Sequence, residues 1–354
     1  MIVPLPLPDV SHWRCLFPAL PMRQTRGRAI GFCGAAAVAV TVGNGWRETP
    51  CWWPAGAPVP IDSGARKRVV AVRAGGDDIA GYWLRSDGSA GGALDWRLQD
   101  GALQARELHP ASGWEWTWAL GAGGGCLVGS GRQKAARGSR TRDRPLCWLA
   151  DGRMVELPLL EPESEALACA TDGVHVVGHA KCREGQCAVL WAVDCRSVVM
   201  LGSLDGLSEV CGVADGEQVG YFWAEGAARA ALWRGTAASR IDLTPVGFAD
   251  ARAFGCGGGY QVGFVIRRRQ TRSGGASPLT RAALWAGSAP SWIDLQALLP
   301  PPWNASSAIA VGVFGDTLRV VGEAQQVVME NEGTRNERYF LAAQVPVTWE
   351  TKIA

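Results

Sequence analysis

Short runs of apolar residues recur along the whole chain, and turn residues separate them. Between residues 166 and 204 four such runs follow one another, ALACATDG, VHVVGHA, AVLWAVD and SVVMLGSL. The same order returns over residues 209–243 and again over residues 251–295. Within each run apolar residues alternate with others, and Val, Ile, Trp and Tyr are frequent, which is typical of β-strands. We find no convincing amphipathic pattern of helical period.

Two markers allow the repeats to be counted. An apolar residue followed by glycine ends the second run, at Val42-Gly43, Ala80-Gly81, Val128-Gly129, Val177-Gly178, Val219-Gly220, Val262-Gly263 and Val321-Gly322. A tryptophan marks the third run, at Trp53, Trp96, Trp148, Trp191, Trp233 and Trp285, and Tyr339, Phe340 and Leu341 take its place in the last repeat. The glycines define seven repeats, and the spacings from Gly178 to Gly220 and from Gly220 to Gly263 are about the length of a four-stranded propeller blade, roughly 40–50 residues.

Small sheets that are apolar on both faces are stable only when they stack against one another. Radial stacking buries those faces and leaves short edges, so the pattern predicts an all-β fold, a seven-bladed β-propeller with four antiparallel strands per blade. We expect one domain over residues 1–354, its last blade closed by an N-terminal strand, and a loose tail over residues 347–354. The expected blades cover residues 25–63, 66–108, 114–158, 164–204, 207–243, 250–296, and 304–345 together with 12–17.

The repeat resembles the bacterial HAF-type propeller repeats, which have an A-x-V…VVG…A-x-LW…I-D-L cadence. The resemblance covers about residues 25–345. The repeat resembles Kelch repeats more distantly, since it lacks their Gly-Gly after the second strand, and it has no GH…WD pair of the WD40 type. The resemblance implies a propeller fold and points to no particular activity, because such scaffolds support many functions.

Composition narrows the cellular setting. The net charge of +2 gives no bulk electrostatic reason to expect nucleic acid as a partner. The 11 cysteines are odd in number and scattered, which favours a reducing, cytoplasmic compartment over export. The apolar stretch 29–42 is too short to span a membrane, which needs roughly 20 apolar residues, and it aligns with the first two strands of other repeats. We therefore expect no membrane partner.

Long connections between second and third strands occur in three repeats, over residues 130–145, 265–281 and 324–338, and propeller geometry places them on one rim. Insertions confined to one face often mark a binding surface. This rim predicts a site for a protein partner, an acidic one above all, while solvated, flexible loops are the alternative. The rim residues are Arg132, Lys134, Arg137, Arg140, Arg142, Arg144, Arg267, Arg268, Arg269 and Arg272, with Trp46, Trp83 and Trp223 in companion loops.

A second candidate site is the mouth of the central channel, where each first strand begins with a polar residue. Converging acids and bases in a funnel could form a small-molecule or catalytic site, and a hydrated, charge-balanced channel is the alternative. The residues are Arg28, Arg68, Glu115, Glu165, Glu209, Asp250 and Ser307.

Histidine and cysteine lie close together in the fourth repeat, at His175, His179, Cys182 and Cys187. His179, Cys182 and Cys187 could ligate zinc, and the two cysteines could form a hairpin disulfide in an exported protein. The two histidines fall about 13 Å apart along a strand, so they are poor co-ligands. We expect unrelated side chains here, and no metal or cofactor.

Sequence motifs for nucleophilic or phosphate chemistry are absent. There is no G-x-S-x-G, no P-loop and no H-E-x-x-H. The sequence therefore favours a non-catalytic propeller that binds a protein partner through its long-loop rim. Two alternatives stay open: a small-ligand binder or enzyme, a lyase or hydrolase, with its site at the channel mouth, and a glycan-binding propeller that uses rim tryptophans.

Overall fold

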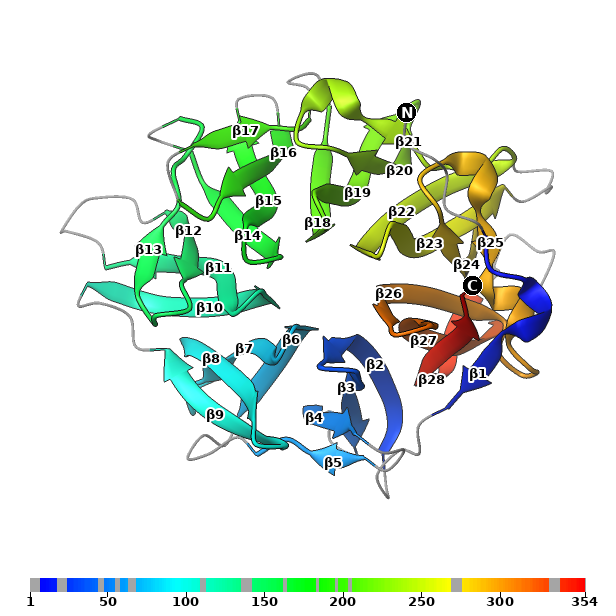
Figure 1. Ribbon diagram of the computed structural model, residues 1–354, viewed down its shortest axis with the longest axis horizontal. Helices are drawn as coiled ribbons and strands as arrows, with labels where there is room; N and C mark the ends of the chain where they lie inside the picture. Colours follow the sequence, from blue (N-terminus) through cyan, green and yellow to red (C-terminus); the bar gives the residue numbers. More distant parts are fainter. Residues whose placement is uncertain are drawn as a thin grey trace.

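The computed structural model describes residues 7–17, 24–43, 48–54, 58–62, 68–108, 113–134, 142–161, 164–182, 185–194, 197–202, 206–268, 276–330 and 338–353. Strands dominate these residues and the helical elements are short 3₁₀ turns, which confirms the prediction of an all-β chain. No helix in the described ranges has the length and apolar character needed to cross a membrane. Small sheets surround a central axis, as in a β-propeller (Figure 1).

Strands of four kinds follow one another along the chain. The innermost strands are β2 (Gln24–Cys33), β6 (Val69–Gly75), β10 (Trp114–Gly123), β14 (Ala166–Thr171), β18 (Ser208–Ala214), β22 (Phe248–Gly257) and β26 (Ala305–Phe314). The second strands are β3 (Ala36–Gly43), β7 (Asp78–Leu84), β11 (Cys126–Gln133), β15 (His175–Cys182), β19 (Glu217–Ala224), β23 (Tyr260–Arg268) and β27 (Thr317–Glu330).

The third strands are β4 (Glu48–Trp53), β8 (Ala90–Gln99), β12 (Asp143–Trp148), β16 (Gly185–Ala192), β20 (Ala227–Trp233), β24 (Ala276–Trp285) and β28 (Arg338–Lys352). The outer strands are β1 (Arg14–Leu16), β5 (Val59–Pro60), β9 (Ala102–Leu108), β13 (Met154–Glu156), β17 (Val198–Met200), β21 (Ile241–Asp242) and β25 (Ile293–Asp294). The 3₁₀ turns are η1 (Val10–His12), η2 (Ala237–Ser239), η3 (Ala289–Ser291) and η4 (Leu295–Leu298).

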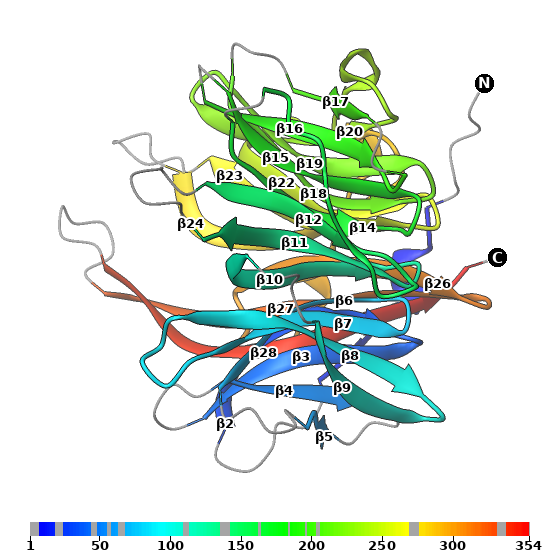
Figure 2. The ribbon, with the colours of Figure 1, turned by 90° about the vertical axis from the view of Figure 1, so that its left-hand side faces the viewer.

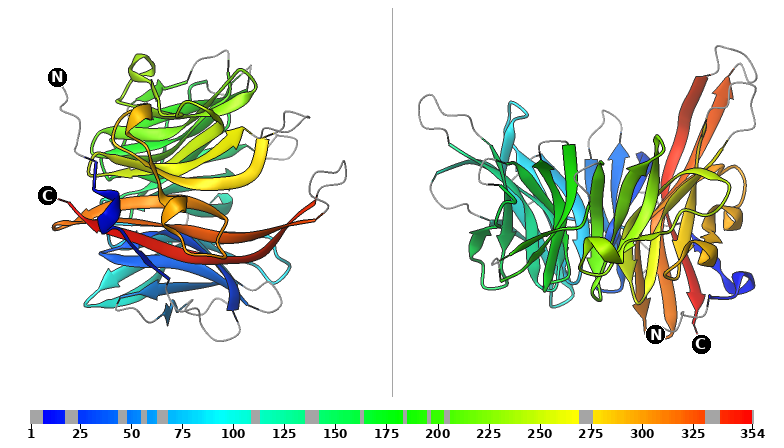
Figure 3. Two further views of the ribbon diagram at one scale, coloured as in Figure 1. Left: turned by 90° about the vertical axis from the view of Figure 1, so that its right-hand side faces the viewer. Right: turned by 90° about the horizontal axis from the view of Figure 1, so that it is seen from above.

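Four sheets contain four antiparallel strands each, β10–β13, β14–β17, β18–β21 and β22–β25. The other strands form one 12-stranded sheet, because single residue pairs bridge β2 to β28 (Arg26 with Gln344) and β2 to β6 (Gly31 with Ala74). The N-terminal strand β1 pairs antiparallel with β28. Seen from the side, the β27–β28 hairpin extends beyond the other strands (Figures 2 and 3).

Each innermost strand contains a β-bulge at the same position, and this bulge explains the repeated glycine. In the β18–β19 pair, Val210 lies just before the bulge and pairs with Gly220. A Cβ atom on Gly220 would lie 1.9 Å from the carbonyl oxygen of Glu209. A Cβ atom on Gly129 or on Gly263 would likewise lie 1.9 Å from a backbone carbonyl oxygen. The glycine therefore marks a close approach of two backbones that leaves no room for a side chain.

The first repeat departs from this pattern. The residue that pairs before the β2 bulge is Ala39, opposite Ala29, and Val38 precedes it. The predicted marker Val42-Gly43 was therefore placed too far along β3. In β2 and β3 the alternation of apolar residues is nearly unbroken, so sequence alone did not fix the register.

The recurring tryptophans fill the spaces between neighbouring sheets. Trp233 of β20 packs on Val177 and Leu190 of the preceding sheet, and Trp285 of β24 packs on Leu232 in the same way. The six fully buried tryptophans are Trp96, Trp148, Trp191, Trp233, Trp285 and Trp349. An indole buries a large apolar area, so each of these tryptophans is a major contact within its core cluster.

The expectation of a loose C-terminal tail is wrong. Residues 347–352 belong to β28, and Trp349 is fully buried against Leu284 and Leu295 of the preceding strands. Trp349 also occupies the tryptophan position of the last repeat, which had been assigned to residues 339–341. Those residues lie in the far end of the extended hairpin, where Phe340 is 46% exposed. The unusual length of β27 and β28 moved the marker away from its expected spacing.

A buried carboxylate lies in the third strand β8. Asp95 is fully buried, Arg106 donates to its Oδ2 at 2.8 Å, and no described group hydrogen-bonds to its Oδ1. Burial, with a contribution from nearby Asp78, raises the pKa of Asp95 to about 6, although Arg106 and Arg97 oppose the shift. An acid whose folded pKa is raised stabilises the fold below its unfolded pKa, and this contribution is lost as pH rises through the folded pKa.

We therefore expect Asp95→Asn to flatten the pH dependence of stability. Between pH 5 and pH 8 the wild type should lose about 1 kcal/mol of unfolding free energy that the variant keeps, because the buried carboxylate ionises over this range. Urea unfolding at the two pH values measures the difference. The exposed neighbour Asp77, changed to Asn, is the control and should leave the pH dependence as it is. Equal pH slopes for wild type and Asp95→Asn would contradict the prediction.

Candidate functional site

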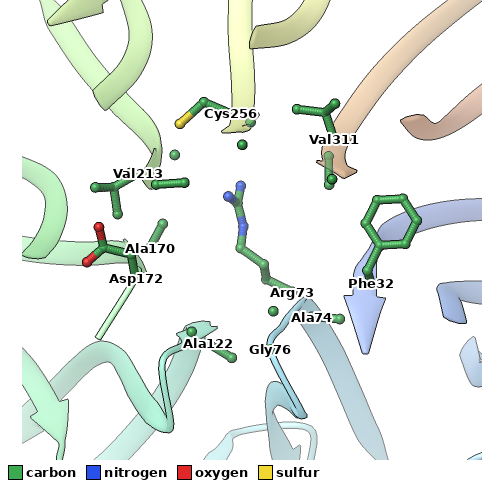
Figure 4. A pocket seen from close by; sticks show the side chains of 18 of the residues that line it. Phe32, Arg73, Ala74, Gly76, Ala122, Ala170, Asp172, Val213, Cys256 and Val311 are labelled. Atoms are coloured by element: carbon green, nitrogen blue, oxygen red, sulfur yellow. The ribbon is translucent and has the colours of Figure 1, made fainter. Parts of the chain in front are cut away.

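A cavity of about 490 Å³ lies on the central axis. Its walls are the carboxyl ends of all the innermost strands, together with the turns that lead to the second strands. Figure 4 shows the side chains that surround it, and most of them are short. The cavity thus has a backbone frame, set by the bulged strands, and few side chains that project into it.

One position explains why the cavity exists. The residue after each bulge pairs with the apolar residue of the second strand, and in all innermost strands but one it is small. The small residues are Gly31, Gly121, Ala170, Gly212, Gly255 and Ala310. In β6 the corresponding residue is Arg73, which pairs with Ala80. The small residues let neighbouring strands approach and leave the axis open, and the arginine enters the space that they leave.

Arg73 spans the channel. Its side chain extends from β6 toward the axis, as Figure 4 shows. Its Nη1 donates a hydrogen bond of 2.8 Å to the carbonyl oxygen of Cys211 in β18. No carboxylate in the described part of the chain forms an ion pair with it. The guanidinium is half-buried, so it is a cation held across the axis by a neutral acceptor.

Two carboxylates also line the cavity. Asp172 is held by its own turn, since its Oδ1 accepts from the backbone N–H of Val174 at 2.9 Å and of His175 at 2.7 Å. Its Oδ2 lies 3.4 Å from Nδ1 of His175. Asp77 is exposed on the turn after β6. Both acids lie at the turns that surround the mouth of the cavity, while Arg73 reaches the axis.

The remaining polar groups of the wall have backbone partners. The hydroxyl of Thr171 donates to the carbonyl oxygen of His175 at 2.8 Å. The thiol of Cys256 donates to the carbonyl oxygen of Glu217 at 3.6 Å, and burial raises its pKa. A thiol in that state is a weak nucleophile. The wall is otherwise apolar, with Phe32 and Phe314 packed edge to face at 5.1 Å between ring centres.

The predicted channel-mouth residues lie at or near the starts of the innermost strands, at the other end of the channel, and none of them lines this cavity. The structure pairs several of them with residues of the same or a nearby strand. Glu165 accepts from Lys181 at 2.5 Å, Glu209 accepts from Tyr221 at 2.6 Å, Asp250 lies 3.7 Å from Arg252, and Arg28 donates to the carbonyl oxygen of Ala71 at 3.5 Å. Arg68 is exposed and Ser307 is buried. The backbone carbonyl oxygen of Glu115 accepts a hydrogen bond from the guanidinium of Arg85. As ligand-binding residues they stay a prediction.

Half-buried acids, Glu209 and Glu323, lie near these strand starts together with their partners. Burial raises the pKa of Glu323, although Gln344, Arg28 and Gln325 oppose the shift. Burial and the hydrogen bond to Glu209 raise the pKa of Tyr221. Glu209 accepts from Tyr221 and Glu323 accepts from Gln344 and Gln325, so both carboxylates have hydrogen-bond partners within the fold.

The basic rim is partly neutralised where the structure describes it. Arg132 lies 2.7 Å from Asp143, and Arg144 lies 3.6 Å from Glu156. Lys134 is exposed and Arg142 half-buried, Arg267 lies over the ring of Phe248, Trp83 packs beside Gly91, and Trp223 is 40% exposed. Arg137, Arg140, Arg269, Arg272, Trp46 and the side chain of Arg268 lie outside the described residues.

His175 and His179 make local contacts. His175 faces Asp172, and Nδ1 of His179 lies 4.0 Å from Sγ of Cys169 in the neighbouring strand. The side chain of Cys182 lies outside the described residues. Among the side chains that the structure does describe, no group of three or more His, Cys, Asp or Glu is arranged to hold a metal ion.

Solved structures similar to this chain include a puromycin hydrolase and several peptidases. A puromycin hydrolase mutant complexed with PGG has a TM-score of 0.57 and 15% identity, over 93% of this chain and 55% of that protein. A Mycobacterium tuberculosis puromycin-hydrolyzing peptidase has a TM-score of 0.53 and 14% identity, over 99% of this chain and 56% of that protein. The Pyrococcus horikoshii acylaminoacyl peptidase has a TM-score of 0.54 and 9% identity, over 94% of this chain and 53% of that protein. The chain thus spans little more than half the length of each, and the likeness shows the fold.

No protein-family model matches the chain, and no curated protein matches it. The resemblance to HAF-type repeats therefore stays a prediction. The main functional expectation, a non-catalytic module that holds a protein partner on its rim, is contradicted by the comparisons, because the similar structures are puromycin hydrolases and acylaminoacyl peptidases. The names of these structures agree with the hydrolase alternative of the sequence analysis.

Arg73 was not among the predicted site residues, although the sequence contains a signal for it. Every innermost strand except β6 contains an apolar-apolar-small triplet, such as Ala29-Ile30-Gly31 and Ala253-Phe254-Gly255. The corresponding triplet in β6 is Ala71-Val72-Arg73. Aligning all the triplets would have shown a long cationic side chain where the others have glycine or alanine.

Proposed function

We propose that this chain is the ligand-binding propeller of a hydrolase that acts on small acyl or peptidyl compounds, and that the axial cavity is its binding site. The observation that carries the proposal is the cavity itself, which has about 490 Å³ of space on the axis and Arg73 projecting into it. Ligand sites are commonly concave, largely apolar pockets of about 300–1,000 Å³ with a few convergent polar groups. The likeness to puromycin hydrolases and acylaminoacyl peptidases supports a ligand of this class.

The chemistry of the described wall favours binding over bond cleavage. Thr171 and Cys256 are its hydroxyl and thiol groups, and both donate to backbone carbonyls instead of facing a base. A nucleophile needs an adjacent base or a lowered pKa to be activated. We therefore assign hydrolysis to groups other than the described residues of this cavity.

We also propose that the ring is a single seven-bladed domain. Four separate four-stranded sheets and three further strand groups within the 12-stranded sheet support this count. The pairing of β1 with β28 supports closure of the last blade by the N-terminal strand, since β1 lies where the other groups have their outer strand. Closure of this kind leaves no open sheet edge between the chain ends.

Ala310→Phe tests the proposed site, because Ala310 occupies the same register position as Arg73 and its side chain should enter the cavity. We expect wild-type protein to bind puromycin and N-acetyl-L-phenylalaninamide saturably in isothermal titration calorimetry. Ala310→Phe should lose this binding because the added ring occupies the space. Ala102→Phe, on the exposed strand β9, is the matched control and should bind as wild type. Absence of binding to the wild type, or equal binding by both variants, would contradict the proposal.

A further inference from the structure

The charge that faces the axial cavity comes from a single unusual residue. Arg73 stands where every other innermost strand has glycine or alanine, so the ring provides the length and width that a guanidinium needs. Gly212 and Gly255 have no side chain to meet it, and a Cβ on either would lie within 3 Å of the neighbouring backbone. The geometry thus concentrates one cation in a wall of small residues.

Most of the hydrogen-bonding capacity of that cation is unused. A guanidinium has five N–H donors in a fixed plane. The carbonyl oxygen of Cys211 accepts one of them at 2.8 Å, and within the described ranges no other acceptor takes the rest. That one bond fixes the side chain across the channel and leaves the remaining donors of the fork for a ligand.

The acids near the cavity do not neutralise Arg73. Asp172 is engaged by Val174 and His175 on its own turn, and Asp77 lies on an exposed turn. Neither forms an ion pair with the guanidinium within the described residues. A half-buried cation without a counter-charge is costly, and an anion that enters the cavity would relieve this cost.

We infer that Arg73 is the anion-recognition group of the axial cavity, and that the ligand carries one carboxylate attached to an apolar body. This inference rests on the proposed ligand-binding function. A carboxylate matches the planar fork of an arginine and balances one positive charge, whereas a phosphate dianion would need further cationic donors. The apolar part of the wall, with Phe32, Phe314, Val213 and Val311, suits an aliphatic or aromatic body. N-acyl amino acids and short peptides with a free carboxyl end have this chemistry.

Calorimetric titration of the full chain with matched probes tests the inference. N-acetyl-L-phenylalanine carries the carboxylate, N-acetyl-L-phenylalaninamide is its neutral counterpart, and phenyl phosphate offers a dianion. We expect the acid to bind about 10- to 100-fold more tightly than the amide, the range of charge-assisted hydrogen bonds. Arg73→Met should lower the affinity for the acid to that for the amide and leave the affinity for the amide unchanged. Arg85→Met removes an exposed arginine outside the cavity and should leave both affinities as in wild type.

The outcomes separate this inference from the proposed function. If acid and amide bind the wild type equally, or if Arg73→Met leaves the acid affinity unchanged, the assignment of Arg73 is overturned while the cavity remains a ligand site. If phenyl phosphate binds more tightly than the acid, the choice of a carboxylate is overturned. If neither acid nor amide binds the wild type, the proposed function fails together with this inference. The comparison of acid with amide uses unaltered protein, so it holds even if Arg73→Met does not fold.

Discussion

Replacing Trp349 by alanine should lower the free energy of unfolding by about 3–5 kcal/mol, the cost of truncating a large buried aromatic side chain. Trp349 is fully buried between β28 and the preceding sheet, and its indole N–H donates to the carbonyl oxygen of Leu295 at 3.1 Å. Its removal would leave a cavity and an unsatisfied acceptor. Urea unfolding followed by circular dichroism measures the change.

Trp223→Ala is the matched control for this substitution. Trp223 is 40% exposed near the end of β19, so its truncation removes a similar volume from a surface site. We expect a loss of less than about 1 kcal/mol there. Comparable losses for the two variants would mean that Trp349 is not part of the buried core against Leu284 and Leu295.

Gly220→Ala should destabilise the chain by about 2–3 kcal/mol, near the upper end of the usual cost of overpacking. The new methyl group would lie 1.9 Å from the carbonyl oxygen of Glu209 and 2.8 Å from the Cα of Val210. Both are backbone atoms, so the two strands must separate at the bulge to make room. Thermal unfolding by calorimetry reports the loss as a lower midpoint.

Gly206→Ala tests whether this effect comes from the close approach or from losing a glycine. A Cβ at Gly206 would have one neighbour, the carbonyl oxygen of Trp223 at 3.7 Å, which is an ordinary contact. We expect this variant to be near neutral. If Gly220→Ala were equally neutral, the bulge would not be the reason for the repeated glycine.

The strand pattern was predictable because each of its causes is local. Alternation, turns and the tryptophan in strands such as β20 and β24 depend on neighbouring residues, so they leave a periodic trace. The positions of Val38-Ala39 and Trp349 were missed for the opposite reason. The first lies in an apolar run with no break in register, and the second follows an extended hairpin of unusual length.

The candidate site could not be read from local pattern, because it depends on which ends of the strands surround a void. Arg28, Glu209 and Asp250 were expected to gather at a channel mouth, and in the structure each forms a hydrogen bond with a residue of a neighbouring strand. The axial cavity arises from small residues spread over the whole chain, whose effect appears when the strands meet. Arg73 departs from that set and so could have been found by comparing repeats.

The two main-chain bridges of β2 make the ring mechanically uneven. Arg26 and Gly31 connect β2 to strands on both sides, whereas β10–β13, β14–β17, β18–β21 and β22–β25 remain separate sheets that meet through side chains. The arc from β28 through β2 to β6 therefore adds backbone pairs to its side-chain contacts. One net backbone hydrogen bond contributes about 1 kcal/mol, whereas truncating one buried indole costs about 3–5 kcal/mol, so the packed tryptophans dominate the cohesion of the ring.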